Sequence, residues 1–336
     1  MKLKLKHIYK YLIWMTIPVF LWWAFKSVQL ENVFHILQNL STSKILLYVL
    51  INIFIAFSLS FRWWYILKGM GQVIEYGKLL ILRIAAFSIS YLTPGPQFGG
   101  EPLQVYGLYK LHGVSYATST SSVMLDKIFE LITNLSVLAV SSFIIMELNF
   151  LPQYFNLGLI VTLAIFITMP VALLILYFRN KKPVSSILKY ILKMRGMKLF
   201  NYSLISKVEY VESKLQDYII TNPARIIAIL GISASGWILI FFEYWIVMLF
   251  LGKSLTLLQL FIIIIIIRIS FLLPLPGALG ALEAAHVLAM QSLGLDPALG
   301  ISMCILIRFR DFLLSLIGIR ITLKISRSYI TITTEN

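Results

Sequence analysis

The sequence is poor in charge, in cysteine and in enzymatic signatures. Only 13% of its 336 residues are charged, and its single cysteine, Cys304, lies in an apolar stretch. One cysteine cannot form an intrachain disulfide or a cysteine metal site. The chain has no Gly-rich Walker loop, no His-Glu-x-x-His and no Gly-x-Ser-x-Gly elbow, and its four histidines are widely spaced. We therefore expect no metal, no cofactor and no catalysis by this chain alone.

Apolar residues are in excess. They make up 59% of the chain, and the mean hydropathy is +0.88, a balance typical of integral membrane proteins. Backbone groups in lipid must be hydrogen-bonded internally, so even the β-branched run 262–267 is predicted to be helical. A crossing of about 30 Å needs roughly 20 apolar residues. We expect an all-α polytopic protein with six full crossings, at about 11–29, 45–67, 118–146, 156–178, 224–251 and 298–322.

Two pairs of shorter apolar pieces lie between these crossings. They are 79–93 with 97–111, and 256–273 with 278–292. Half-helices of roughly 15 residues rise only about 22 Å, which is short for a crossing. We therefore predict two re-entrant helical hairpins, 79–111 and 256–292. The alternative is that each piece is a short or kinked full crossing.

The same proline-glycine break splits both pairs. A shift of 182 positions superposes Pro94-Gly95 on Pro276-Gly277 and Glu101 on Glu283, and a shift of 181 then places Lys127 on Arg308 and Glu130 on Asp311. Further glycines that allow tight turns at the breaks are Gly99, Gly100 and Gly280. Paired interruptions of hydrophobic segments in two halves are a pointer to a transport site.

Charge placement predicts the orientation. The amino terminus carries Lys2, Lys4, Lys6 and Lys10, and positive charge beside a crossing favours the cytoplasm. Counting crossings forward, 147–155 falls outside without Lys or Arg, whereas 179–217 falls inside with nine basic and three acidic residues. Both termini are then cytoplasmic, in a multi-pass protein of the cell membrane.

The same count predicts an inverted-topology repeat. Three crossings separate the hairpins, so the first hairpin enters from the cytoplasm and the second from outside. The halves 10–147 and 224–325 then form one transmembrane domain, 1–336, of a kind that many transporters use for alternating access. Association into a homo-oligomer is compatible with this arrangement.

The segment 181–220 is the largest soluble piece. Apolar residues recur in it at helical spacing, at Leu204, Val208, Val211, Leu215 and Tyr218, and Glu212 falls on another face. Either an amphipathic surface helix or a helical hairpin beneath the bundle fits this pattern. Its basic charge, within a net charge of +15, predicts contact with anionic lipid rather than with nucleic acid.

Ionisable residues at membrane depth are costly and usually face a partner or a wet cavity. Two pairs lie three apart on a helix and can neutralise themselves, Lys127 with Glu130 and Arg308 with Asp311. Such pairs are either structural or ligand-binding. Arg83 and Arg268 have no carboxylate three or four places away, so each must find a counter-charge elsewhere in the fold or on a ligand.

Glu101 and Glu283 each begin the second half-helix of a hairpin. A carboxylate there is favoured by the helix dipole and can accept bonds from exposed backbone N–H groups. The functional alternative is that the two glutamates orient cavity cations or take up a proton. The exposed N–H groups at the hairpin tips would suit a phosphate.

These motifs resemble a known family. The motifs are Pro94-Gly95 to Gly99-Gly100-Glu101-Pro102, the crossing with Asp126-Lys127 to Glu130, and Pro276-Gly277-x-x-Gly280-x-x-Glu283. They resemble the flippase-like family that includes the membrane region of lysylphosphatidylglycerol synthases. The resemblance covers about 10–325. It implies movement of lipids or lipid-linked precursors between leaflets, with Glu101 and Glu283 as the motif glutamates. It implies no lysyl transfer, because we recognise no soluble aminoacyl transferase in the sequence.

The leading hypothesis is therefore a flippase or scramblase whose cavity takes a phosphate-bearing headgroup, on a phospholipid or a polyprenyl-linked lipid. The expected headgroup cations are Arg83, Lys127, Arg268 and Arg308. Two alternatives stay open. One is a transporter of a small anion or ion, and the other is a non-transporting subunit of an envelope lipid or glycan synthesis system.

Overall fold

The described chain is almost entirely helical. The computed structural model describes residues 16–26, 28–93, 99–147, 164, 168, 170–194, 202–273 and 275–334, and no β-strand occurs within them. The all-α prediction is confirmed for this part of the chain. Besides the helical residues 16–26 and 170–178, the helices are α2 (Leu30–Gln38), α3 (Thr42–Gly69), α4 (Tyr76–Leu92), α5 (Glu101–His112), α6 (Tyr116–Glu147), α8 (Pro183–Met194), α9 (Tyr202–Thr221), α10 (Pro223–Phe250), α11 (Leu257–Ser270), α12 (Ala281–Ser292) and α13 (Pro297–Thr334), with the short 3-10 helix η1 (Pro276–Ala278) between α11 and α12.

The helix boundaries repeat along the chain. Helices α3 and α10 both have 28 residues, and their first residues, Thr42 and Pro223, are 181 positions apart. The same separation joins the starts of α4 and α11 and those of α6 and α13. Helices α5 and α12 each have 12 residues, and the glycines beyond them, Gly113 and Gly294, have φ of 66° and 65°. The sequence repeat is therefore a repeat of structure.

Local sequence explains where the repeated helices begin. Ser115 Oγ accepts a bond from Thr118 N at 3.2 Å at the start of α6, and Asp296 Oδ1 accepts one from Ala298 N at 2.8 Å at the start of α13. Thr256 forms a capping box at the start of α11. Each side chain satisfies a backbone donor that a helix leaves unpaired at its first turn.

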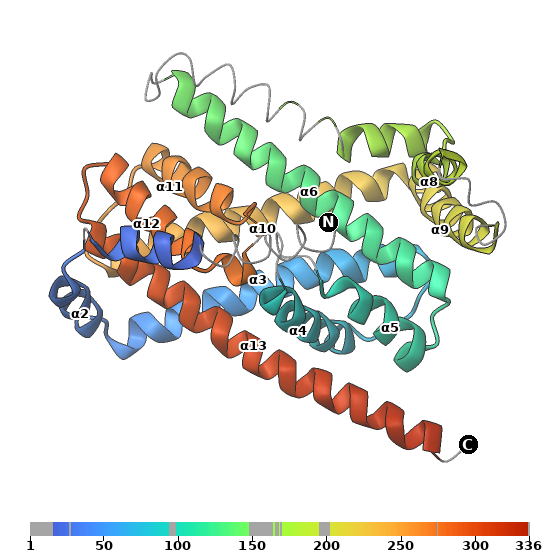
Figure 1. Cartoon of the computed structure of the whole chain (residues 1–336), viewed down its shortest axis with the longest axis horizontal. Coiled ribbons are helices and arrows are strands. Elements are labelled where there is room, and N and C mark those ends of the chain that lie inside the picture. The colour runs from blue at the N-terminus through green and yellow to red at the C-terminus, as the bar shows by residue number, and fades with distance from the viewer. Residues whose placement is uncertain are drawn as a thin grey trace, which may run out of the picture.

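Helices α3 and α10 pack against each other in opposite directions. Lys44 Nζ, near the start of α3, donates to Phe250 O at the end of α10, 3.1 Å away. Midway along both helices, the hydroxyls of Ser58 and Ser235 lie 3.5 Å apart. Figure 1 shows the two helices side by side. By length and composition, both are candidates to cross a membrane.

The two halves interlock through the other helices. Helix α4 packs against α13, and α11 packs against α6. A Cβ added to Gly318 of α13 would lie 2.4 Å from Ile84 O of α4, so these two helices touch at the backbone. Each half therefore depends on the other for its packing.

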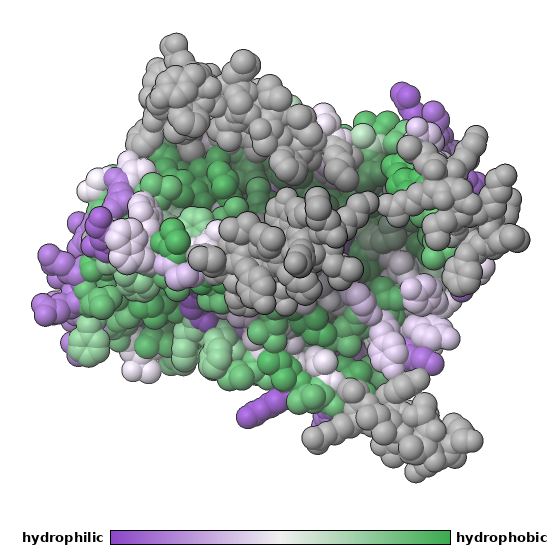
Figure 2. All heavy atoms as spheres, viewed as in Figure 1, coloured by the Kyte–Doolittle hydropathy of each residue, from purple (hydrophilic) through white to green (hydrophobic). Residues whose placement is uncertain are grey.

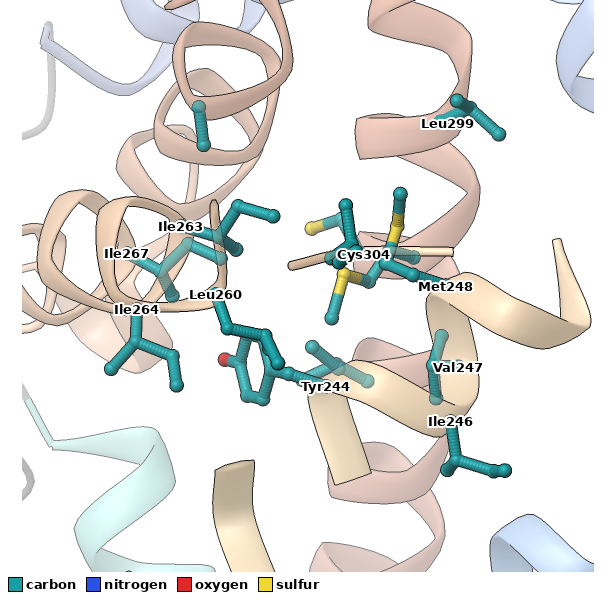
Figure 3. Close-up of a cluster of buried hydrophobic side chains, with 14 of the residues drawn as sticks. Tyr244, Ile246, Val247, Met248, Leu260, Ile263, Ile264, Ile267, Leu299 and Cys304 are labelled. Atoms are coloured by element: carbon teal, nitrogen blue, oxygen red, sulfur yellow. The ribbon is translucent and has the colours of Figure 1, made fainter. Parts of the chain in front are cut away.

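The largest buried cluster joins α3, α10, α11, α12 and α13. Figure 3 shows its aliphatic side chains, with Tyr244 and Val247 from α10 facing Ile263 and Ile267 from α11, and Cys304 from α13 between them. This cluster fixes the second hairpin-like pair, α11 and α12, against the bundle.

Large apolar side chains also cover the outside of the bundle. Phe54 and Leu46 on α3 are exposed by 56% and 65%, and Phe309 and Phe312 on α13 by 59% and 55%. In Figure 2, hydrophobic side chains dominate much of the surface that is not grey, and many hydrophilic ones lie at its left and right edges. A surface of this kind is typical of a protein that is solvated by lipid.

The described helices test the predicted crossings. Helices α3, α6 and α10 match the predicted 45–67, 118–146 and 224–251 closely, but α13 extends to Thr334, well beyond the predicted end at 322. Most of the predicted crossing 156–178, and the break residues Pro94 and Gly95, lie outside the described residues.

The segment 181–220 contains the helical hairpin α8–α9. Leu215 and Tyr218 of α9 are buried against α6, as their spacing predicts. Glu212 corrects the sequence interpretation, because it is fully buried rather than on a polar face. Its carboxylate accepts bonds from Val184 N at 2.8 Å and Ser185 N at 2.9 Å, and so caps the start of α8.

Candidate functional site

A charged cavity lies where α3, α4, α5, α6, α10, α11 and α13 meet. Its volume is about 270 Å³, and it is lined by the charged side chains of Arg62, Arg83, Glu101, Lys127, Glu130, Glu243, Arg268, Arg310 and Asp311. Eight ionisable candidates were predicted from the sequence, and six of them are in this lining, namely Arg83, Glu101, Lys127, Glu130, Arg268 and Asp311. The other two, Glu283 and Arg308, lie directly beside the cavity, because Arg308 binds the backbone of Gly277 and Ala278, which line it.

Asp126 bridges two arginines on one side of the cavity. Its Oδ1 lies 2.6 Å from Arg62 Nε, and its Oδ2 lies 2.9 Å from Arg83 Nη1. Arg62 and Asp126 are almost completely buried. Arg83 therefore finds its counter-charge within the fold, on another helix, and does not require a ligand for it.

Glu130 and Glu101 complete this first network. Glu130 lies 3.4 Å from Arg62, 3.7 Å from Arg83 and 3.0 Å from Lys127, so the predicted Lys127–Glu130 pair is present. Lys127 Nζ also lies 3.1 Å from Glu101. The other oxygen of Glu101 accepts a bond from Gly99 N at 2.7 Å. Glu101 therefore both binds backbone at the break and holds a cation.

Arg308 and Glu283 form the corresponding pair in the second half. Two guanidinium nitrogens of Arg308 lie 2.9 and 3.1 Å from the two carboxylate oxygens of Glu283. Arg308 also donates to the carbonyls of Gly277 and Ala278. These residues have left-handed φ angles of 53° and 51°, which are unusual for alanine. The ion pair thus stabilises the strained turn at the break.

The predicted Arg308–Asp311 pair is wrong. Asp311 instead accepts a bond from the adjacent Arg310 at 2.9 Å. Arg310 also pairs with Glu243 of α10 and donates to Asn52 Oδ1 of α3 at 2.8 Å. Helical spacing placed Arg308 and Asp311 near one another, but Glu283 offers Arg308 a bidentate partner, which is the stronger geometry.

The repeat relates these networks. Glu101–Lys127 and Glu283–Arg308 occupy matched positions in the two halves and make matched contacts. Arg62 of α3 matches Glu243 of α10, again 181 positions on, with the opposite charge. In each half, the residue at this position forms an ion pair with the long helix that follows the break. Arg62 pairs with Asp126 of α6, and Glu243 pairs with Arg310 of α13.

The turn at the second break contacts the end of α4. Arg308 Nη1 donates to Tyr91 Oη at 3.3 Å, and a Cβ added to Gly277 would lie 3.2 Å from the Tyr91 ring. Tyr91 is the penultimate residue of α4, just before the first break. The inner end of α4 therefore lies against the turn at the second break, beside the cavity.

Arg268 differs from the other cavity cations. Among the described residues, no carboxylate forms an ion pair with it, and its Nε is buried without a hydrogen-bond partner. Its guanidinium carbon lies 4.7 Å from the centre of the Trp237 ring and 5.7 Å from that of Phe271. This stacking stabilises a cation but leaves its N–H groups available to an acceptor.

Sequence reasoning did not select four residues that hold the site together, Arg62, Asp126, Glu243 and Arg310. All four are ionisable residues within apolar segments, which is itself a signal. The repeat gave a second indication that Arg62 and Glu243 belong to the site, because they occupy equivalent positions in the two halves.

Comparisons with known proteins agree with this architecture. The model of the family described as lysylphosphatidylglycerol synthase TM region matches residues 9–318. A UPF0104 membrane protein of Methanocaldococcus jannaschii is 20% identical over 294 residues, which cover 85% of this chain and 86% of the relative. A UPF0104 membrane protein of Pyrococcus horikoshii is 21% identical over 310 residues, covering 88% and 89%. No solved structure matches. The chain is a helical membrane protein and belongs to the lysylphosphatidylglycerol synthase TM region family.

Proposed function

We propose that this protein moves a phosphate-bearing lipid or lipid-linked precursor between the leaflets of the cell membrane. The observation that carries the proposal is the charged cavity at the junction of two repeated halves, inside a bundle with an apolar surface. Polar groups at membrane depth mark substrate pathways, and binding sites of repeat-built transporters lie between the repeats.

In our proposal, an inverted repeat with re-entrant hairpins supplies the symmetry that alternating access to the two sides of the membrane requires. Since α3 and α10 are antiparallel, the outer ends of the pairs α4–α5 and α11–α12 lie at opposite ends of the bundle (Figure 1). Helices of 12 and 14 residues, such as α5 and α11, rise only about 18 to 21 Å, less than a bilayer core. In our proposal the termini are cytoplasmic, as the basic amino terminus favours.

Arg268 is the cation that we assign to the headgroup phosphate. Arg83, Lys127 and Arg308 already have carboxylate partners, so an incoming anion gains less from them. Glu101 and Glu283 hold Lys127 and Arg308 in place. A planar guanidinium stacked on an aromatic ring and short of acceptors suits a phosphate oxygen. Such a mechanism requires no covalent chemistry and no cofactor.

A transporter of a small soluble anion is the second candidate. The cavity volume favours it, because about 270 Å³ accommodates a phosphate-sized group more readily than a whole lipid. In the lipid mechanism, only the polar headgroup enters the cavity and the hydrocarbon tails stay outside.

Reconstituted vesicles distinguish the two candidates. Proteoliposomes would be assayed in parallel for exchange of phosphatidylglycerol labelled on its headgroup and for uptake of inorganic phosphate. The proposal expects lipid exchange above that of protein-free vesicles and no phosphate uptake. Phosphate uptake without lipid exchange would identify the small-anion transporter, and the absence of both would favour a non-transporting subunit.

A further inference from the structure

A second hollow borders the charged cavity. It has a volume of about 580 Å³, and its described lining comes from α5 and α6 alone. The walls are mostly apolar or aromatic, with Val105, Tyr109, Tyr116 and Met124 among them. Tyr109 is exposed by 44% and Tyr116 by 60%, so the hollow opens at the surface of the bundle. We call it the α5–α6 groove.

Glu101 and Lys127 line both the groove and the charged cavity. Their side chains meet at 3.1 Å, so their ion pair stands between the two spaces. The side chain of Glu101 is 21% exposed and that of Lys127 is 20% exposed, which is consistent with contact with each space. A molecule that passed from the groove to the cavity would have to separate this pair or exchange with it.

In the other half of the repeat, the described residues at the equivalent place are close-packed. At the crossing of α12 and α13, a Cβ added to Gly300 would lie 2.5 Å from His286 O, so these two helices touch at the backbone. Ile301, which matches Thr120 of the groove, is only 1% exposed. Residues 16–26 and α2 cover that face, where Ala24 and Val33 pack with Ile301.

The two matched ion pairs therefore have different surroundings. Glu283–Arg308 lies behind the close-packed helices α12 and α13, whereas Glu101–Lys127 faces a groove at the surface. In an alternating-access transporter, one path is open while its symmetry mate is closed. The asymmetry of the halves identifies the open path.

The chemistry of the groove selects its occupant. An apolar wall suits hydrocarbon, and exposed tyrosines at the rim suit the interface of a membrane. Two cations line the groove, Lys110 and, at its inner end beside Glu101, Lys127. A soluble anion would gain nothing from the apolar wall. A lipid with an anionic headgroup matches both the wall and the inner cation.

We infer that the α5–α6 groove is the lateral entrance for an anionic phospholipid, whose acyl chain lies in the groove while its phosphate displaces Glu101 from Lys127 to enter the cavity. This inference rests on the proposed function. The Glu101–Lys127 pair acts as a gate, since it closes again when the phosphate moves on to Arg268.

Photolabelling tests the groove independently of transport. The protein would be placed in phosphatidylcholine vesicles with phosphatidylglycerol that carries a diazirine on its acyl chain, illuminated, and digested for peptide mapping. We expect labelling of α5 and the start of α6 to exceed labelling of the lipid-facing surface of α3 at least threefold. Unlabelled phosphatidylglycerol should reduce this excess, and diacylglycerol should not. Equal labelling of the helices, or equal competition by diacylglycerol, would overturn the inference.

A blocking variant supplies the second readout. Thr120→Trp fills the groove, and we expect it to reduce lipid exchange at least tenfold. The control is Val140→Trp on the same helix, where Val140 is 53% exposed outside the groove. If wild type exchanges lipid and both variants match it, the groove inference fails and the proposed function stands. If groove labelling is specific but wild type exchanges no lipid, the proposed function fails and the groove stands as a lipid site.

Discussion

Arg268 lies over the ring of Trp237, with 4.7 Å between its guanidinium carbon and the ring centre, and has no ion-pair partner among the described residues. In the same cavity, Arg62 lies 2.6 Å from Asp126. The two arginines therefore have different roles. Arg62 balances a buried acid and holds helices together, whereas Arg268 presents its charge to the cavity. Substitutions at the two positions should separate ligand binding from stability.

Arg268→Ala should weaken binding of anionic lipid and change stability little, because it leaves no carboxylate without a partner. We expect the phosphatidylglycerol retained by the purified protein to fall several-fold, measured by lipid mass spectrometry after detergent washing. Arg268→Lys keeps the charge but loses the planar group, and should retain an intermediate amount. Equal retention by Arg268→Ala and wild type would contradict the assignment of Arg268.

Arg62→Ala should destabilise the protein strongly. Arg62 shares the buried acid Asp126 with Arg83, so its removal leaves Asp126 with one cation instead of two. Breaking a buried ion pair costs up to about 3–5 kcal/mol. Thermal unfolding in detergent should show a clear fall in Tm. Lys78→Ala is the control, since Lys78 pairs with Glu75 at 3.3 Å on the exposed surface, where such pairs contribute roughly 0–1 kcal/mol. A smaller loss for Arg62→Ala than for Lys78→Ala would rule out a structural role for Arg62.

Gly100→Ala should disturb the contact between α4 and α5. A Cβ at Gly100 would lie 2.1 Å from Ala86 O, and a backbone atom cannot move aside cheaply. We expect lower Tm and faster proteolysis of the α4–α5 pair. Gly231→Ala is the matched control, because Gly231 lies within α10 and a Cβ there meets nothing within 4 Å. This variant should be neutral or slightly more stable. The close approach is refuted if the two variants behave alike.

The inverted repeat predicts opposite sides for matched loops. Val73 follows α3 and Ser254 follows α10, 181 positions later, and both residues are exposed. We expect Val73→Cys to react with a membrane-impermeant thiol reagent only from inside and Ser254→Cys only from outside, in a Cys304→Ala background. Reaction of both from the same side would exclude the inversion.

Many of the helices could be predicted from the lengths of the apolar segments and from the sequence repeat. The boundaries of α3, α6 and α10 were predictable because lipid leaves an apolar segment little choice but a helix. The end of α13 was not, since a helix can continue past the membrane through Arg320 and Lys324 without cost. The burial of Glu212 was also missed, because helical periodicity cannot reveal a cap contributed to another helix.

The sequence predicted most of the residues that form the candidate site, but few of the ion pairs between them. Local spacing gave Lys127–Glu130, a contact within one helix. The partners of Arg83 and Arg308 lie on other elements, at Asp126 and Glu283, and only the three-dimensional packing decides them. The unpaired state of Arg268 is likewise a property of the assembled cavity, since nearby sequence showed only that Arg268 had no local acid.

Lipid exchange is the property on which the account depends. The decisive measurement is the rate at which headgroup-labelled phosphatidylglycerol moves between leaflets in vesicles that contain wild type, Arg268→Ala or Lys78→Ala, each confirmed as folded. We predict exchange well above protein-free vesicles for wild type and Lys78→Ala, and at least a tenfold lower rate for Arg268→Ala. Wild-type exchange equal to that of protein-free vesicles, or an Arg268→Ala rate equal to wild type, would contradict it.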